Sequence, residues 1–240
     1  MSNPSIEAKS LEEAPSSAIG MIRLRNIGRE YVRGNERLSI LNGVDLDVPV
    51  GAFEALMGPS GSGKSTLLNL IAGLDLPTHG TIEVASARID RMTEAQRTQW
   101  RARHLGIVFQ TYNLIPVLTA RENVELPLLL TSLSSKQRKE RSIFALSIVG
   151  LSDRSSHLPR QLSGGQEQRV AIARAIVNDP DLIIADEPTG DLDRASGDEI
   201  LALFERLNRE MNKTILMVTH DPAAAERASI VHRLDKGTMS

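Results

Sequence analysis

The sequence GPSGSGKST at residues 58–66 fits the pattern G-x-x-x-x-G-K-[ST] of a phosphate-binding loop. An apolar run at residues 53–57 predicts a strand before it, and residues 67–74 predict a helix after it. Free backbone N–H groups at a helix start attract anions, and glycines let the backbone wrap closely around phosphate oxygens. The stretch therefore predicts a nucleotide site, in preference to a glycine-rich turn that only caps a helix.

This loop gives each of its residues an expected role. Lys64 is expected to reach the β- and γ-phosphates of a nucleoside triphosphate, and the Ser65 hydroxyl to bind Mg²⁺. The nucleotide-binding residues predicted from the loop are Gly58, Pro59, Ser60, Gly61, Ser62, Gly63, Lys64, Ser65 and Thr66.

The composition of the 240-residue chain excludes several classes of protein. Lysine and arginine (28) nearly balance aspartate and glutamate (30), which argues against a general affinity for nucleic acid. The chain has no cysteine, so disulfides and thiolate metal sites are excluded. No apolar run approaches the roughly 20 residues of a membrane-spanning helix. Residues 1–18 are expected to be a flexible extension and not a signal peptide, and residues 19–240 to form one domain.

Two strands are predicted before the phosphate loop, at residues 22–32 and 39–48, joined by a turn at residues 33–35. We expect them to pair in an antiparallel sheet, and a further strand to span residues 81–89. Tyr31 lies at the end of the first strand. It could stack on the base of a nucleotide or simply cover the sheet edge, and its position favours neither.

The run DLIIAD at residues 181–186 predicts a strand buried on both faces. Ligands of α/β folds bind at the carboxyl ends of such strands, where Asp186 and Glu187 lie. We expect Asp186 to be a second Mg²⁺ ligand beside Ser65, and Glu187 to be the base for a water attacking the γ-phosphate. Taken alone, the two acids could merely lead into the turn at residues 188–190.

A second buried strand is predicted at residues 214–219 and ends on His220. A histidine at a strand end is usually structural. Because this strand end is expected beside the others that carry polar residues, we interpret His220 as a γ-phosphate contact.

A second glycine-rich helix start is the sequence LSGGQ at residues 162–166. Ser163 and Gln166 fit a capping box, which explains them as a helix start and nothing more. Gly164 and Gly165 are not explained in this way, because glycine destabilises the first turn of a helix. They fit a backbone that another molecule approaches closely, so the chain contains two helix starts suited to anions.

Residues 119–130 and 134–149 predict two helices that form an insertion on the main sheet. The spacing of Phe144, Ile148 and Leu151 predicts one apolar stripe.

In this order, the motifs resemble those of the ATP-binding-cassette (ABC) ATPase family, and the resemblance covers residues 20–240. The matching features are the phosphate loop, the Q-loop glutamine Gln110, the signature LSGGQ at residues 162–166, the Walker B segment LIIADE at residues 182–187, the D-loop GDLD at residues 190–193 and the switch histidine His220.

The resemblance implies an α/β fold, with a P-loop NTPase (RecA-like) core, an antiparallel β subdomain and an α-helical subdomain. It implies an ATPase that uses ATP and Mg²⁺, and cassettes that pair head to tail so that each ATP contacts the LSGGQ of the other copy. The expected catalytic residues are Glu187, His220, Gln110 and Lys64. Further expected nucleotide contacts are Tyr31, Ser163, Gly164, Gly165 and Gln166, and the expected metal ligands are Ser65, Gln110 and Asp186.

The stretch at residues 103–127, which includes VFQTYNLIPVLTARENVELP, resembles the MacB/LolD type of cassette. Relatives of this type work with membrane subunits that move lipoproteins, peptides or drugs, or that transmit force. The resemblance therefore implies a homodimer bound to integral membrane permease subunits at the cytoplasmic face of the inner (plasma) membrane, without nucleic acid. The alternative is a soluble ABC ATPase acting on DNA or ribosomes. Such proteins usually carry coiled-coil insertions or two cassettes in one chain, and this chain has neither.

The loop at residues 112–118 is unusually apolar, and exposed apolar loops often mark partner sites. We expect Leu114, Ile115 and Leu118 to line a groove for a cytoplasmic helix of the membrane subunit. The alternative is that these residues anchor the loop in the core.

Overall fold

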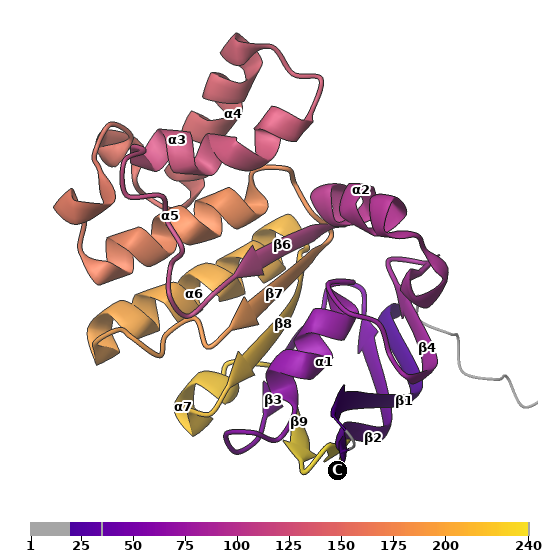
Figure 1. The fold of residues 1–240 in the computed structure, drawn as a ribbon. Coiled ribbons are helices and arrows are strands. Elements are labelled where there is room, and N and C mark those ends of the chain that lie inside the picture. Colours follow the sequence, from indigo (N-terminus) through magenta and orange to yellow (C-terminus); the bar gives the residue numbers. More distant parts are fainter. Residues whose placement is uncertain (1–19, 35, 240) are drawn as a thin grey trace, which may run out of the picture.

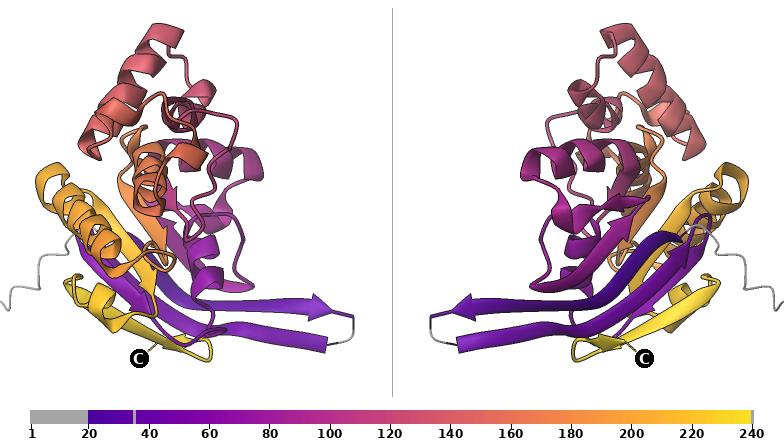
Figure 2. Two further views of the ribbon diagram at one scale, coloured as in Figure 1. Left: turned by 90° about the vertical axis from the view of Figure 1, so that its left-hand side faces the viewer. Right: turned by 90° about the vertical axis from the view of Figure 1, so that its right-hand side faces the viewer.

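Two β-sheets organise the part of the chain that the structure describes, residues 20–34 and 36–239, in a computed structural model (Figure 1). Residues 1–18, predicted to be a flexible extension, lie outside this part. The smaller sheet is antiparallel in the order β2-β1-β4-β5. Its strands are β1 (Gly20–Arg33), β2 (Glu36–Pro49), β4 (His79–Val84) and β5 (Ala87–Arg88). The antiparallel pair predicted before the phosphate loop is confirmed as β1 and β2, whose hairpin extends from the body of the molecule (Figure 2).

The larger sheet has the order β10-β9-β3-β8-β7-β6 and is parallel except for β10. Its strands are β3 (Phe53–Met57), β6 (Leu105–Val108), β7 (Leu182–Asp186), β8 (Thr214–Thr219), β9 (Ile230–Asp235) and β10 (Thr238–Met239). The strand buried on both faces that is predicted at residues 181–186 is confirmed as β7, which begins one residue later, at Leu182. Ile183 and Ala185 join one hydrophobic cluster, and Leu182 and Ile184 join the other.

Helices cover both faces of the parallel sheet. One face packs against α5 (Gly164–Ile176) and α6 (Arg194–Met211), and the helical insertion packs in turn on α5. The other packs against α1 (Lys64–Ile71) and the antiparallel sheet. The remaining helices near the core are α2 (Glu94–His104), α7 (Pro222–Ala225) and the 3-10 turns η1 (Ile89–Arg91), η3 (Ser152–Arg154) and η4 (Pro159–Gln161).

The predicted helical insertion is present at the edge of the molecule above α5 (Figure 1). It consists of α3 (Ala120–Glu125), the 3-10 turn η2 (Leu126–Leu130) and α4 (Ser135–Ile148). The apolar stripe predicted on it is wrong, because Phe144 is 64% exposed and Leu151 lies beyond the helix end, after Gly150. The buried face of α4 carries Ser142, Ala145 and Leu146 instead, because this is the face that packs against α3 and α5.

The single strand predicted at residues 81–89 is also wrong. The chain turns back at Ala85 and Ser86, so that β4 and β5 form a hairpin. Both turn residues have positive φ, 48° and 61°, as a two-residue hairpin turn requires. Neither is a glycine or an asparagine, so the sequence carries no ordinary signal for this turn.

Candidate active site

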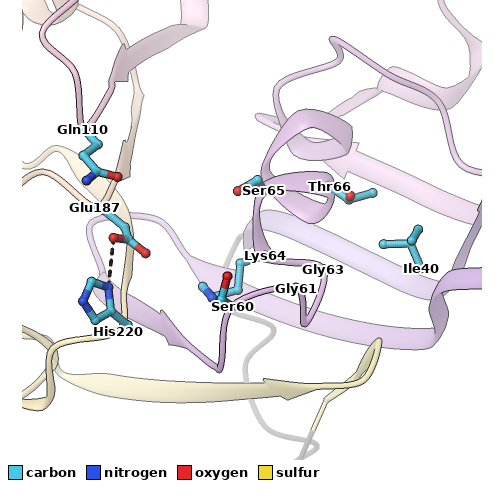
Figure 3. A pocket seen from close by; sticks show the side chains of 10 residues that line it. All are labelled: Ile40, Ser60, Gly61, Gly63, Lys64, Ser65, Thr66, Gln110, Glu187 and His220. Carbon is cyan, nitrogen blue, oxygen red and sulfur yellow. Dashed lines mark ion pairs between the residues drawn. The ribbon is translucent and has the colours of Figure 1, made fainter. Parts of the chain in front are cut away.

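Four strand ends of the parallel sheet meet at one cavity of about 630 Å³ (Figure 3). The loop after β3 supplies the phosphate-loop residues, and the ends of β6, β7 and β8 supply Gln110, Glu187 and His220. The residues that line the cavity are Ile40, Ser60, Gly61, Gly63, Lys64, Ser65, Thr66, Gln110, Glu187 and His220. The cavity thus brings together half of the residues predicted for the site, and of the predicted residues around the phosphate loop and β7, Gly58, Pro59, Ser62 and Asp186 are not among its lining residues. Ile40, on β2, is a lining residue that no sequence pattern indicated.

The phosphate loop leaves the start of α1 without a side-chain cap. Gly63 is the residue before the helix, and its φ of 106° lies in the left-handed region that glycine adopts readily. Uncapped N–H groups at a helix start make an anion site. Gly58 is needed for a different reason, because a Cβ there would lie 2.1 Å from the Leu234 carbonyl oxygen. The loop therefore packs closely against β9, while the N–H groups at the start of α1 remain available to a phosphate.

Lys64 is almost buried and bends back over the loop. Its Nζ donates hydrogen bonds to the carbonyl oxygens of Gly58 (2.8 Å) and Pro59 (2.9 Å). The Ser62 hydroxyl is buried and has no hydrogen-bond partner among the described residues. A positively charged group satisfied only by neutral carbonyls would gain from an anion in the cavity.

Asp186 ends β7 as a half-buried carboxylate. Burial raises its pKa above the ordinary value, the charge of Glu187 raises it further, and Lys64 opposes the change. Within residues 20–34 and 36–239 no side chain or backbone group forms a hydrogen bond or ion pair with the Asp186 carboxylate. A cation would relieve this arrangement.

The oxygen atoms available near the loop fit Mg²⁺. The predicted ligands are the Ser65 hydroxyl, the Gln110 amide oxygen and the Asp186 carboxylate, which are the hard donors that Mg²⁺ prefers. No group of three or more histidine or acidic side chains suited to a metal occurs in the described part of the chain. Such a site would therefore be shared with phosphate oxygens and water, which is how Mg²⁺ is usually held beside a nucleotide.

Glu187 and His220 form an ion-pair contact in the cavity, 2.9 Å between Glu187 Oε2 and His220 Nδ1 (Figure 3). Glu187 has a φ of 46°, which is uncommon for a residue with a side chain. Its N–H donates to the Val218 carbonyl oxygen (2.9 Å), and its own carbonyl accepts from the Gly190 N–H (3.0 Å). These bonds hold the unusual backbone and direct the carboxylate into the cavity.

Gln110 reaches across to the segment after β7. Its Nε2 donates to Asp191 Oδ1 at 2.9 Å, and it faces the phosphate loop from the same side as Glu187 (Figure 3). No sequence pattern indicates Asp191 as its partner, since the two residues are 81 positions apart.

Tyr31 does not line the cavity. Its hydroxyl donates to Asp75 Oδ2 (2.8 Å), and the Arg29 guanidinium lies 4.4 Å from the centre of its ring. Arg29 also donates to Asp75 Oδ1 (2.8 Å), so one carboxylate holds both side chains. The two interpretations of Tyr31, a platform for a base or a cover for the sheet edge, both remain predictions.

The second glycine-rich helix start, at α5, lies outside the cavity. The capping box is confirmed: Ser163 Oγ accepts from the Gln166 N–H (3.3 Å), and Gln166 Oε1 accepts from the Ser163 N–H (3.1 Å). Packing within the chain also favours glycine at both positions. A Cβ on Gly164 would lie 2.9 Å from the Tyr112 hydroxyl, and one on Gly165 would lie 3.2 Å from Ser196.

The apolar loop at residues 112–118 only partly lines a groove. Leu118 borders a hollow of about 440 Å³ together with Leu126 and Leu129 of the helical insertion. Leu114 packs against the core, so the prediction that it lines the groove is wrong, and the core-anchoring alternative holds for it. The buried Asn123 side chain fixes the loop through hydrogen bonds with the backbone of Ile115 and Leu118.

In the described part of the chain, no helix combines the length and the apolar character needed to cross a membrane.

Known proteins resemble this chain in sequence and in structure. Residues 41–190 match the family described as ABC transporter. The lipoprotein-releasing system ATP-binding protein LolD of Legionella pneumophila is 46% identical over 211 residues, which cover 88% of this chain and 93% of LolD. The macrolide export ATP-binding/permease protein MacB 1/2 of Paracoccus denitrificans is 46% identical over 219 residues, which cover 91% of this chain and 33% of that protein.

A solved structure is similar over nearly its whole length. It is the dimeric ATP-binding cassette MJ0796 of Methanocaldococcus jannaschii in a post-hydrolysis state bound to ADP and Pi, with a TM-score of 0.84 and 42% sequence identity. The match covers 92% of this chain and 97% of the other.

Proposed function

The chain belongs to the ABC transporter family, and we propose that it is the ATP-hydrolysing subunit of a MacB/LolD-type complex that drives a membrane permease by transport or by transmitting force. ATP binding and hydrolysis follow from its family and from its similarity to a cassette solved with ADP and Pi. The observation that carries the proposal is the cavity at the four strand ends, which gathers the phosphate loop, Gln110, Glu187 and His220.

Within this cavity each side chain has a separate role in ATP hydrolysis. The N–H groups at the start of α1 and the Lys64 ammonium bind the phosphates of ATP and hold the γ-phosphate in place. Glu187 accepts the proton of the attacking water, and His220, 2.9 Å from it, keeps the carboxylate oriented and contacts the γ-phosphate. Ser65, Gln110 and Asp186 would hold Mg²⁺, which supplies positive charge to the β- and γ-phosphates.

We propose that two copies complete each ATP site. In one chain the start of α5 lies outside the cavity, although its first turn is suited to an anion. A second copy placed head to tail would bring Ser163, Gly164, Gly165 and Gln166 to the ATP bound by the first. Each copy would then contribute the same two surfaces, which gives a symmetric dimer. The dimeric state of the similar cassette MJ0796 supports this arrangement.

The permease surface that we propose is the hollow bordered by Leu118, Leu126 and Leu129. It lies beside the loop that follows Gln110, so a helix seated there would follow movements of the nucleotide site. The name of the MacB relative joins an ATP-binding protein to a permease in one chain, and that of LolD describes the ATP-binding part of a releasing system. We therefore propose attachment to permease subunits at the cytoplasmic face of the inner membrane.

The proposal is tested by isolating the chain from detergent-solubilised membranes together with its permease. We expect the wild type to hydrolyse ATP and to co-purify with integral membrane subunits. Leu118→Ser combined with Leu129→Ser should abolish co-purification and leave ATP binding unchanged.

The matched control is Leu38→Ser, which removes an exposed leucine on β2, away from the hollow. It should retain the permease. Sedimentation with ribosomes or DNA in place of membranes would contradict the membrane role.

A further inference from the structure

Gln168 is a fully buried amide on α5 that has no part in the site described above. Its Nε2 donates to the Pro188 carbonyl oxygen at 2.7 Å and to the Phe109 carbonyl oxygen at 3.3 Å. Both partners are acceptors, so only the amide nitrogen can face them, and the orientation of the side chain is fixed. Gln168 thus joins one helix to two separate loops.

Each of these carbonyls lies next to a residue of the catalytic cavity. The Phe109 carbonyl belongs to the peptide bond that leads into Gln110, and Pro188 directly follows Glu187. Rotating either peptide unit would turn the neighbouring side chain away from the phosphate loop. A shift of about 1 Å in a reacting group can reduce a rate 10²-fold.

The backbone at Glu187 depends on such support. Its φ of 46° is held by two hydrogen bonds of its own peptide groups, to Val218 and from Gly190. The bond from Gln168 to Pro188 is a third restraint on the same turn. Strained backbone at a functional site persists only where the surroundings hold it.

The other end of the amide carries no compensating bond. Gln168 Oε1 is buried and has no hydrogen-bond partner in the described part of the chain. A buried acceptor without a partner costs free energy, and an apolar side chain of the same length would avoid that cost. The two donated bonds are therefore the feature that requires glutamine here.

The position of Gln168 on α5 adds a connection between the two ATP sites. The same helix begins with Ser163 and Gly164, which under the proposed function contact the ATP of the second copy. A helix moves as a unit, so a shift of its start displaces the Gln168 amide and both carbonyls together.

We infer that Gln168 is a positioning residue for ATP hydrolysis. Through its two hydrogen bonds it fixes the backbone beside Gln110 and beside Glu187 at the same time, when α5 contacts the ATP held by a second copy. The inference rests on the proposed function. It assigns to Gln168 no contact with ATP, with Mg²⁺ or with the attacking water.

The test is Gln168→Met, which keeps the length and volume of the side chain and removes both donors. We expect kcat to fall roughly 10²-fold while KM and the Kd for ATP change less than about threefold, because the phosphate loop is untouched. The variant should also remain a dimer in Mg-ATP on size-exclusion chromatography, since slow hydrolysis preserves the ATP that joins the copies. Gln168→Asn keeps the amide but is shorter, and should lose less of the rate.

The matched control is Gln96→Met, which removes an exposed glutamine at the start of α2 and should leave both rate and dimer unchanged. A wild-type kcat in Gln168→Met would overturn the inference. So would a rise of the Kd that parallels a fall in melting temperature in both variants, because that pattern describes a purely structural residue. Wild-type protein with no ATPase activity would count against the proposed function itself, whereas an active wild type with an unaffected Gln168→Met counts against Gln168 alone.

Discussion

The two glycine-rich helix starts of this chain look alike in sequence but differ in how they are completed. At α1 the residue before the helix is Gly63, in a left-handed conformation and without a side-chain cap. At α5 it is Ser163, in an extended conformation, and the capping box with Gln166 satisfies two backbone N–H groups. The α1 start faces a cavity, whereas the α5 start does not line it.

This difference indicates which helix start binds a ligand in a single copy of the chain. Among the described residues the α1 start has no side-chain cap and Lys64 is hydrogen-bonded only to carbonyls, so an anion completes it. At the α5 start the capping box already satisfies two of the backbone N–H groups, and the glycines also make room for Tyr112 and Ser196. We therefore expect changes at α1 to affect ATP binding by a single copy, and changes at α5 to affect the pairing of copies.

The largest expected effect separates binding from hydrolysis. Glu187→Gln keeps the shape of the side chain but removes the proton acceptor, so ATP hydrolysis should fall roughly 10²–10⁴-fold. ATP should still bind, and because it is not consumed, both helix starts should remain engaged in a stable dimer. The measurement is phosphate release together with size-exclusion chromatography in Mg-ATP.

Two outcomes would contradict this role of Glu187. One is hydrolysis at the wild-type rate. The other is a monomeric Glu187→Gln protein at saturating ATP, which would break the proposed pairing of α1 and α5 between copies.

The next effect concerns the α1 start alone. Lys64→Ala removes a charged donor to the phosphates, and a hydrogen bond to a charged group contributes about 1.5–3 kcal/mol. The affinity for ATP should therefore fall roughly 10–100-fold, and dimer formation should fail at ATP concentrations that saturate the wild type. Titration of a fluorescent ATP analogue measures the affinity, and an unchanged Kd would show that the carbonyl-bonded position of Lys64 persists in the complex.

A smaller effect tests the α5 start. Gly164→Ala places a Cβ 2.9 Å from the Tyr112 hydroxyl, which is the far end of a flexible side chain. The single copy should therefore fold with little change in melting temperature and bind ATP normally. The ATP-dependent dimer should weaken about tenfold, which corresponds to 1.4 kcal/mol.

The combination of Gly164→Ala with Tyr112→Phe decides between the two reasons for this glycine. Removal of the Tyr112 hydroxyl makes room for the Cβ within the chain. If the dimer then recovers fully, Gly164 serves packing inside one copy, and the α5 start is not a surface for pairing through this glycine. If the dimer remains weak, the glycine is needed where the other copy approaches.

The features that the sequence predicted well are those with a local cause. The phosphate loop, the buried strand β7 and the capped start of α5 each depend on residues within a few positions of one another. The turn at Ala85 and Ser86 could not be predicted, because its positive φ angles are adopted by residues that rarely adopt them. The exposure of Phe144 depends on which face of α4 meets α3 and α5, which is decided by tertiary packing.

Contacts between residues far apart in the chain also could not be predicted from the sequence. The bonds from Gln110 to Asp191 and from Gln168 to Pro188 join segments 81 and 20 positions apart, without a spacing that marks them. Part of the candidate site was therefore predictable as a set of residues, but its network of restraints was not.

The smallest expected effect concerns Asp186, the unpaired carboxylate beside the α1 start. Its pKa is raised by burial and by Glu187, so the folded protein binds this proton more tightly than the unfolded chain does. The stability that the protonated form contributes is therefore lost as the pH rises from the ordinary value of 3.8 through the raised value. Asp186→Asn stays neutral, and without nucleotide its melting temperature should exceed that of the wild type by about 1–3 °C at pH 7, with the difference vanishing near pH 4.

Addition of Mg-ATP should reverse this order, because the cation favours the charged carboxylate that Asn lacks. Asp193, at the start of α6, provides the control of opposite sign, since hydrogen bonds from Ser196 lower its pKa. Asp193→Asn should therefore gain nothing at pH 7. If Asp186→Asn is less stable than the wild type at pH 7 without nucleotide, the carboxylate already has a partner in the free protein. The cavity side next to α1 would then lack the open carboxylate that helps to distinguish it from the α5 start.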